Sequence, residues 1–232
     1  MINDKTVIAI IPARGGSKGL PGKNTMEVNG KPLLAWTIDH ANGSKYIDRV
    51  ILSSEDDEII KIAKKHGCDV PFVRPTALAS DTAGTMGVVF HALQTLPEKY
   101  DYVVLLQVTS PLRTSHDIDF CIEQCEKNNV PACVSVMETD KSPFWMYRLD
   151  NNNLMDPIIS GTKLPKRRQD VSTIYSINGA VYVAKTNWLA KQEHFITAET
   201  TAYVMPKLRS IDIDTELDLM VLQSIVEKNK SL

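Results

Sequence analysis

The chain has 232 residues, 43% of them hydrophobic, so it is long enough to bury one sizeable core without a structural metal or disulfides. A formal net charge of -2 gives no overall basic field, which argues against nucleic-acid binding. No signal peptide is visible, and no apolar run approaches the length of a membrane span. We therefore expect one cytoplasmic domain over residues 1–232, with neither nucleic acid nor a membrane as partner.

The first predicted element is a buried strand over residues 7–11, and it leads into a glycine-rich basic loop that ends at Asn24. Glycines let backbone N–H groups approach an anion, while Arg14, Lys18 and Lys23 supply positive charge. The spacing matches neither a Walker A loop nor the dinucleotide-binding fingerprint. We interpret the loop as a phosphate cradle, the alternative being a flexible surface loop.

Helical and strand patterns then alternate as far as residue 137. Predicted helices cover about 33–42, 54–66 (capped by Ser54-x-x-Asp57), 89–96 and 114–125 (capped by Thr114-x-x-Asp117), and predicted strands cover 49–53, 69–73, 102–106 and 132–137. The four cysteines lack Cys-x-x-Cys spacing, so we expect reduced core residues rather than metal ligands. The alternation predicts a three-layer α/β fold with a mostly parallel, Rossmann-like sheet, which binds ligands at the carboxyl ends of its strands.

This alternation breaks between residues 138 and 178, where Asn151 to Asn153 predict a turn and residues 163–168 form a basic segment. We interpret the insertion as a lid or an arm within the single domain. Strand patterns resume over 179–184, 202–205 and 210–214, and Thr215-x-x-Asp218 is expected to cap a final helix.

Two aspartates alternate with isoleucines near the carboxyl end, in Ile211-Asp212-Ile213-Asp214. On a strand this alternation sends both carboxylates to one face, where they repel each other unless a cation lies between them. Mg²⁺ is a suitable cation, because it prefers one or two carboxylates together with waters and phosphate oxygens. The alternative is that Asp214 only caps the last helix and Asp212 is solvated.

Polar clusters also follow two of the predicted strands. Gln107, Thr109 and Arg113 come after the strand over 102–106, and Arg74 precedes the segment Leu78-Ala79-Ser80-Asp81-Thr82. Both clusters lie where an open α/β sheet binds its ligand. Each is also explained by helix-leading turns and caps, so composition leaves the two interpretations open.

Taken in order, these motifs resemble those of the CMP-sialic acid synthetases (acylneuraminate cytidylyltransferases), including bacterial enzymes that activate legionaminic acid. The resemblance spans nearly the whole chain. It is carried by the loop from Ile11 to Asn24, by Arg74-Pro75 with Leu78 to Thr82, by Leu106-Gln107 with Thr109 to Arg113, by Arg168-Gln169, by Asn178 to Tyr182, and by Ser210 to Asp218.

The resemblance implies a nucleotidyltransferase-type fold with a protruding dimerisation arm at about 138–178, a homodimer, CTP as substrate and Mg²⁺ as cofactor. It implies a nucleotide site formed by Ala13, Arg14, Gly15, Lys23, Asn24, Ser80 and Gln107. It implies a sugar site formed by Gln107, Arg168, Tyr182 and Phe195, with Gln107 between nucleotide and sugar. Arg14, Lys23, Asp212 and Asp214 would be the catalytic set, with the two aspartates on the metal.

Two positions depart from the pattern of that family. Ser176 stands where many sialic acid enzymes have arginine, and Phe144-Trp145 stands where some have a sugar-binding lysine after a proline. The loss of two cations near an acidic sugar predicts altered sugar contacts. Lys141, Arg167 or Arg168 would be the compensating cation in this hypothesis.

The implied reaction is attack by the anomeric hydroxyl of a nine-carbon α-keto acid sugar on the α-phosphorus of CTP, which releases pyrophosphate. Positioning and charge neutralisation would supply most of the catalysis. The proton acceptor is either a metal-bound water or a carboxylate such as Asp212. Alternatives are a cytidylyltransferase for pseudaminic or 3-deoxy-octulosonic acid, and a non-catalytic CTP-binding protein.

Overall fold

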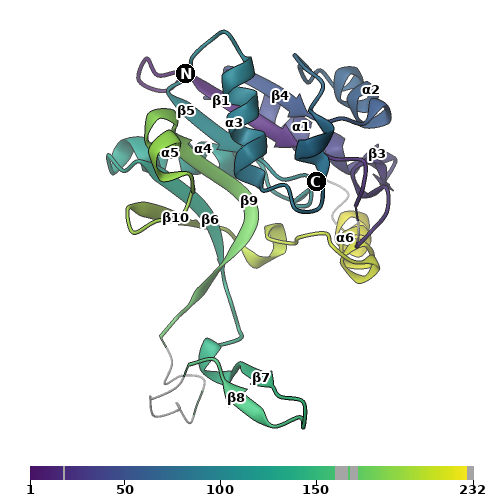
Figure 1. Ribbon diagram of the computed structural model, residues 1–232, viewed down its shortest axis with the longest axis vertical. Helices are drawn as coiled ribbons and strands as arrows, with labels where there is room; N and C mark the ends of the chain where they lie inside the picture. Colours follow the sequence, from purple (N-terminus) through teal and green to yellow (C-terminus); the bar gives the residue numbers. More distant parts are fainter. Residues whose placement is uncertain (18, 160–166, 168–171, 229–232) are drawn as a thin grey trace.

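A six-stranded sheet forms the centre of the protein, in a computed structural model that describes residues 1–17, 19–159, 167 and 172–228 (Figure 1). The strand order is β10-β6-β9-β5-β1-β4. The strands are β1 (Val7–Pro12), β4 (Arg49–Ser53), β5 (Tyr102–Leu105), β6 (Ala132–Glu138), β9 (Tyr175–Lys185) and β10 (Thr200–Val204).

Five of these strands share one direction. β4, β1 and β5 pair in parallel, as do β6 and β10, whereas β9 is antiparallel to both of its neighbours, β5 and β6. The predicted mostly parallel sheet is therefore confirmed. Because β9 runs the other way, its first residues lie at the same edge of the sheet as the carboxyl ends of β5 and β6.

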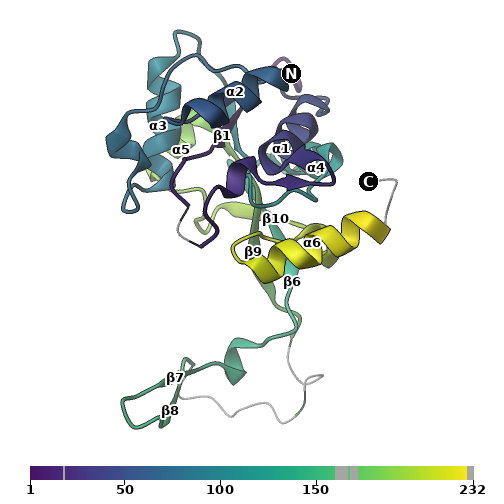
Figure 2. The ribbon, with the colours of Figure 1, turned by 90° about the vertical axis from the view of Figure 1, so that its right-hand side faces the viewer.

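Helices cover both faces of the sheet and complete three layers (Figures 1 and 2). They are α1 (Leu33–Asn42), α2 (Asp57–Lys65), α3 (Thr85–Thr95), α4 (Ser115–Lys127), α5 (Thr186–Gln192) and α6 (Glu216–Lys228). Alternate residues of β1 face the two layers, since Val7 and Ala9 pack with α1, α2 and α4 while Ile8 and Ile10 pack with α3 and α5. All four cysteines are buried with free thiols.

Two predicted strands are wrong. Over 69–73 only Asp69 forms a bridge, to Ile51, and Pro71 then has no N–H with which to continue a ladder. Residues 210–214 lie outside the sheet, where Ile213 N donates to Thr109 O at 2.8 Å without a run of paired neighbours. The burial alternation predicted there nevertheless holds, with Ile213 buried and both aspartates exposed.

Helix caps are partly as predicted. Thr114 and Asp117 form the expected capping box of α4. For α2, however, the Asp56 carboxylate accepts from Ile59 N at 2.9 Å, so the predicted Ser54-x-x-Asp57 cap is wrong. Asp56 lies two residues closer to the helix than Ser54 and accepts an orphan N–H there. Helix α5 and a small hairpin of β2 (Glu27–Val28) with β3 (Lys31–Pro32) are among the elements that were not predicted.

An arm extends from the body between β6 and β9 (Figures 1 and 2). It carries a short 3₁₀ helix, η3 (Pro143–Trp145), and an antiparallel hairpin of β7 (Tyr147–Leu149) with β8 (Met155–Pro157). The predicted turn at Asn151 to Asn153 joins the two strands, with Asn153 in the left-handed region at φ 63°. Of the basic segment over 163–168, the described part is Arg167, which is exposed. Within the described ranges, every helix is too short or too polar to cross a membrane.

Candidate active site

A cavity of about 390 Å³ opens beside the carboxyl ends of β1 and β5. The loop after β1 lies beside the start of α6 there (Figure 2). Its lining comes from four segments far apart in the sequence: Pro12, Arg14, Ser17, Gly19, Lys23 and Asn24; Arg74, Leu78, Ser80, Asp81, Ala83, Thr85 and Val88; Gln107, Val108 and Thr109; and Asp214. Such a polar crevice outside the strand ends is where open α/β sheets bind ligands.

Two of the described cations that line this cavity, Arg14 and Lys23, are each paired with a carboxylate that also lines it. Arg14 Nη2 lies 2.9 Å from Asp81 Oδ1, and its Nη1 donates to Ser80 O at 3.1 Å. Lys23 Nζ lies 2.8 Å from Asp214 Oδ1 and donates to the carbonyl of residue 213 at 2.7 Å. The basic loop and the acidic segment therefore meet in space although 191 residues separate Lys23 from Asp214. An incoming anion would meet both cations already oriented.

A buried ion pair supports the loop from below. Arg74, only 4% exposed, donates to Glu55 Oε2 at 2.6 Å and to Ala13 O at 3.0 Å. The second oxygen of Glu55 accepts from Gly15 N at 2.9 Å. A Cβ at Gly15 would lie 2.5 Å from Asp56 Oδ2, so a larger residue would displace the side chain that caps α2. Glu55 was missed in the sequence, because nothing in its local pattern separates it from a solvated acid.

The remaining predicted nucleotide residues have different positions around the loop. Asn24 Nδ2 donates to Arg14 O at 2.9 Å and lines the cavity. Ser80 and Gln107 also line it. Ala13 is buried and contributes its backbone carbonyl, and Gly15 lines a smaller hollow on the other side of Arg14. Lys18 lies outside the described residues.

The two predicted metal ligands differ in environment. Asp212 is open to solvent on one side, but the protein atoms around the rest of it raise its pKa, and the Asp214 charge adds to this. Two contacts lower the pKa of Asp212: a hydrogen bond with the Thr109 hydroxyl and the charge of Lys23. A second negative charge nearby therefore makes ionised Asp212 less favourable, as expected for a carboxylate that gains from a cation.

No group of three or more His, Cys, Asp or Glu in the described part of the chain is arranged to hold a metal. The two neighbouring carboxylates, Asp212 and Asp214, are fewer than a structural metal site needs. They do fit Mg²⁺, which takes one or two carboxylates and fills its other positions with waters and phosphate oxygens. The donor set therefore suits a cation that arrives with a phosphorylated ligand.

A second hollow, of about 180 Å³, adjoins the first. It is lined by Thr85, Met86, Leu105, Gln107, Tyr182, His194, Phe195 and Ile196, and it shares Thr85 and Gln107 with the larger cavity. The rings of Tyr182 and Phe195 lie 5.6 Å apart between centroids. Burial, with a contribution from Asp212, raises the pKa of Tyr182, so its hydroxyl stays protonated. Gln107 thus stands between a polar cavity and a more apolar one.

Asn178 joins the segments that form the floor of the site. Its Oδ1 accepts from Ser135 Oγ at 2.6 Å and from Ala180 N at 3.2 Å, and its Nδ2 donates to Ser210 Oγ at 2.9 Å. Gly179 then adopts φ +73°, which favours glycine. The motif that begins at Asn178 therefore sets the path of the segment that leads to Asp212.

The positions that depart from the family pattern lie away from the main cavity. Ser176 is half-buried on β9, and its Oγ has no hydrogen-bond partner among the described residues. Trp145 is 38% exposed on the arm, and Lys141 is exposed. Arg168, predicted for the sugar site, lies outside the described residues.

Comparison with known proteins gives a consistent result. A family model described as cytidylyltransferase matches residues 8–222. The chain is 33% identical to a CMP-N,N'-diacetyllegionaminic acid synthase of Legionella pneumophila, covering 97% of each chain. It is 31% identical to a pseudaminic acid cytidylyltransferase of Campylobacter jejuni, covering 96% of this chain and 97% of that one. A solved CMP:2-keto-3-deoxy-manno-octonic acid synthetase, complexed with CTP, shares the fold at a TM-score of 0.72 and 14% identity, over 97% of this chain and 99% of that one.

Proposed function

Because the chain belongs to the cytidylyltransferase family, we propose that it transfers CMP from CTP to the anomeric hydroxyl of a nonulosonic acid of the sialic or legionaminic type. The products are a CMP-sugar and pyrophosphate. The observation that carries this proposal is the pair of adjoining hollows, one with two oriented cations and one with aromatic walls, which share Gln107.

In this proposal the larger cavity takes CTP. Arg14 and Lys23 contact the phosphates, exchanging their carboxylate partners for phosphate oxygens. Asp212 and Asp214 hold Mg²⁺, which supplies neutralisation of the phosphate charge when bound. The loop itself needs no rearrangement, since the pair of Arg74 with Glu55 already fixes its backbone. Positioning and electrostatic stabilisation then account for the rate.

The smaller hollow takes the sugar. Its walls include Met86, Tyr182, Phe195 and Ile196, which suit the apolar acyl groups of such sugars, and the Tyr182 hydroxyl supplies a polar contact. Gln107 would lie between nucleotide and sugar, which places the reacting groups at the junction of the two hollows. Relatives of nearly equal identity are named for legionaminic and for pseudaminic acid, so the alternative is a cytidylyltransferase for another keto sugar acid.

We extend the proposal to the assembly and its setting. Residues 1–232 form a single cytidylyltransferase domain, and the arm at 138–178 joins two copies into a homodimer in which Arg168 of the arm region contributes to sugar binding. The β7–β8 hairpin lies well away from the body (Figure 1), and its exposed Leu149, Leu154 and Met155 support contact with a second chain. Four free buried cysteines suit a reducing, cytoplasmic environment.

Pyrophosphate release tests the reaction. The purified protein with CTP and Mg²⁺ is offered sialic, legionaminic, pseudaminic and 3-deoxy-octulosonic acids, and at least one of the first two should give CMP-sugar. Lys23→Met should lower kcat/KM by roughly 10²–10³-fold, because it removes a cation from the developing charge. Lys31→Met is the matched control, since Lys31 also pairs with an aspartate, Asp39, but lies outside the cavity.

The outcomes separate the candidate functions. Product only with pseudaminic or 3-deoxy-octulosonic acid would favour the alternative sugar. Tight CTP binding without product from any sugar would favour a non-catalytic CTP-binding protein. Equal losses in Lys23→Met and Lys31→Met would remove Lys23 from the catalytic set.

A further inference from the structure

Arg113 lies beneath the junction of the two hollows rather than in either of them. The sequence places this cation in a polar cluster where ligand is expected, but its side chain is completely buried. Its Nη1 donates to Gln107 O at 3.1 Å and to Ala180 O at 2.7 Å. Arg113 therefore contacts the backbone of the site and not the ligand cavities.

The remaining donors of this guanidinium are left without partners. Nε and Nη2 are buried and have no hydrogen-bond partner among the described residues. Burial lowers the pKa of Arg113 to about 9, and the charge of Asp117 raises it only in part. Asp117 itself is bound by Arg209 and Tyr203. A buried cation with so little compensation is unfavourable for stability, so packing alone does not explain it.

The two carbonyls that Arg113 holds belong to the two strands that frame the junction. Gln107 follows β5 and is shared by both hollows. Ala180 lies on β9, next to Gly179, where a Cβ would lie 3.5 Å from Gln107 Oε1 and 3.9 Å from Asp212 Oδ2. Tyr182, which lines the sugar-side hollow, is two residues further along β9. One guanidinium nitrogen thus ties the end of β5 to the start of this wall.

The phosphate-binding loop has separate supports. The loop that carries Arg14 and Lys23 is fixed by Arg74, Glu55 and Asn24, none of which contacts Arg113 by a hydrogen bond. A change at Arg113 should therefore displace Gln107 and the β9 wall while the phosphate-binding loop stays in place. This separation makes the role of Arg113 measurable.

We propose that Arg113 is a positioning residue that sets the sugar-side geometry of the active site, by clamping the backbone carbonyls of Gln107 and Ala180 from below. This inference rests on the proposed function. Arg113 would then help to determine sugar binding and transfer although it touches neither substrate.

The test compares Arg113→Met and Arg113→Lys with the wild-type enzyme in its full-length form. Arg113→Met should raise the KM for the sugar or lower kcat by about 10–100-fold, because small displacements of a positioned group have effects of this size. The dissociation constant for Mg-CTP should change less than the sugar constants, because Gln107 borders the nucleotide cavity but the loop that carries Arg14 and Lys23 stays in place. Arg113→Lys keeps one donor group and should restore part of the loss.

Ser110→Ala is the matched control. Ser110 lies in the same turn and is buried, but its hydroxyl has no hydrogen-bond partner in the described part of the chain, so its loss should leave the kinetic constants unchanged. Each variant is checked by thermal unfolding, and rates are expressed per folded molecule. If Arg113→Met does not fold, the same comparison of sugar KM and kcat with Mg-CTP affinity is made on Arg113→Lys.

Three results would overturn the proposal. A lowered Tm with unchanged sugar KM and kcat would show a purely structural role for Arg113. An equal loss of CTP affinity would show that the clamp is not specific to the sugar side. A wild-type protein inactive with every sugar would overturn the proposed function itself, and this inference with it, whereas an active wild type confines failure to Arg113.

Discussion

The carboxylates that pair with the cations of the site orient those side chains and add little to the stability of the fold. The pairs Arg14 with Asp81 and Lys23 with Asp214 involve partly exposed side chains, and such pairs contribute about 0–1 kcal/mol to folding. Each fixes a flexible side chain at the edge of the cavity. The entropy cost of ordering these side chains therefore falls on folding and does not weaken ligand binding.

Asp212 gives a prediction in which stability and activity move in opposite directions. Burial raises its pKa, so the folded protein holds this proton more tightly than the unfolded chain does. Its contribution to stability is therefore fully present below the unfolded pKa and is lost as the pH rises through the folded pKa. Above its folded pKa, ionised Asp212 lowers the stability of the fold, so Asp212→Asn should raise the Tm there while it suppresses turnover in Mg²⁺.

Thermal unfolding of both proteins without Mg²⁺, from pH 3 to pH 8, measures the first effect. The difference in Tm should be largest near neutrality and should shrink toward pH 3, where wild-type Asp212 is also neutral. Pyrophosphate release measures the second effect. A variant less stable than the wild type at pH 7, or one with full turnover, would contradict this account of Asp212.

Among single residues, the sequence predicts those whose type and position after a strand already indicate ligand binding. Arg14, Lys23 and Gln107 stand out because cations, glycines and amides follow apolar strands, and the structure places all three around one cavity. Glu55 has no comparable signal, and the signal at Arg113 predicts a contact with ligand rather than with backbone carbonyls. Their roles depend on a backbone carbonyl or N–H that only the folded chain brings near, as when Arg113 reaches Ala180, 67 residues away.

Among the elements, α4 is anchored more firmly than its capping box alone requires. Asp117 accepts from Thr114 N at 2.9 Å and from the Thr114 hydroxyl at 2.8 Å. The same carboxylate accepts from Tyr203 at 3.0 Å on β10 and from Arg209 at 2.8 Å on the 3₁₀ helix η5 (Lys207–Arg209). One buried acid thus joins α4 to the chain that leads toward Asp212.

Asp117→Asn should therefore destabilise the protein by about 3–5 kcal/mol at pH 7, because it leaves the partly buried Arg209 without its partner. Burial by itself would raise the pKa of Asp117, but the hydrogen bonds from Arg209 and Thr114 lower it overall. A lowered folded pKa means that this stabilisation is present above the unfolded pKa, near 3.9, and is lost as the pH falls through the folded value.

Urea unfolding at pH 7 and at pH 3 measures this change. The difference in the free energy of unfolding between Asp117→Asn and the wild type should be smaller at pH 3 than at pH 7. Thr114→Ser, which keeps the capping hydroxyl, should have a free energy of unfolding close to that of the wild type at both pH values. A difference that is equally large at pH 3 would show that the charge of Asp117 is not what stabilises α4.

Most elements with a clear periodic pattern were predicted, and the two predicted strands that failed lack a neighbour in the sheet. The capping boxes at Thr114 and Thr215 are confirmed because a cap needs only residues within one turn. The predicted strands over 69–73 and 210–214 have suitable alternation, but a strand also needs a neighbour along its length. Alternation alone does not reveal whether the sheet has a free edge at that place.

Over the whole molecule, topology explains why distant motifs form one site. Parallel strands bring the loops after β1 and β5 to the same edge, and antiparallel β9 begins at that edge, which adds Asn178 and Gly179. The β-α alternation predicts the parallel strands. It does not predict the reversal at β9, because that reversal depends on the length and path of the arm that precedes it.

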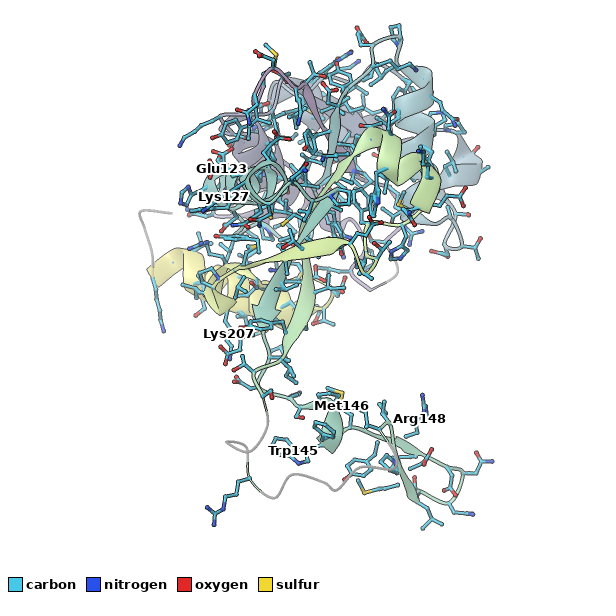
Figure 3. All side chains as sticks on the ribbon, turned by 90° about the vertical axis from the view of Figure 1, so that its left-hand side faces the viewer. Glu123, Lys127, Trp145, Met146, Arg148 and Lys207 are labelled. Carbon is cyan, nitrogen blue, oxygen red and sulfur yellow. The ribbon has the colours of Figure 1, made fainter. Side chains whose placement is uncertain are left out.

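The arm is the part of the molecule whose surface is least suited to an isolated chain. Leu149, Leu154 and Met155 are each more than 60% exposed on the β7–β8 hairpin, and Ile158 is 46% exposed. Trp145 and Met146 lie at the base of this hairpin, far from Glu123 and Lys127 on α4 (Figure 3). Apolar side chains gathered on a protruding hairpin are typical of a protein interface.

The proposed homodimer predicts a change in assembly when this surface is made polar. The double variant Leu154→Asp with Met155→Asp should be a monomer at micromolar concentration, where the wild type should have twice the mass of one chain by light scattering after size exclusion. Both side chains lie outside the core, so the variant should keep its Tm per chain apart from the stability that dimerisation adds. Val73→Asp changes an equally exposed apolar residue on the body and should remain a dimer.

If the partner's arm also completes the sugar pocket, the monomeric variant should bind Mg-CTP normally and show a raised KM for the sugar, because the phosphate-binding loop is built within one chain. A wild type that is monomeric would rule out the dimer. A double variant that stays dimeric would place the interface elsewhere than on the hairpin, and a monomeric variant with an unchanged sugar KM would restrict the arm to assembly alone.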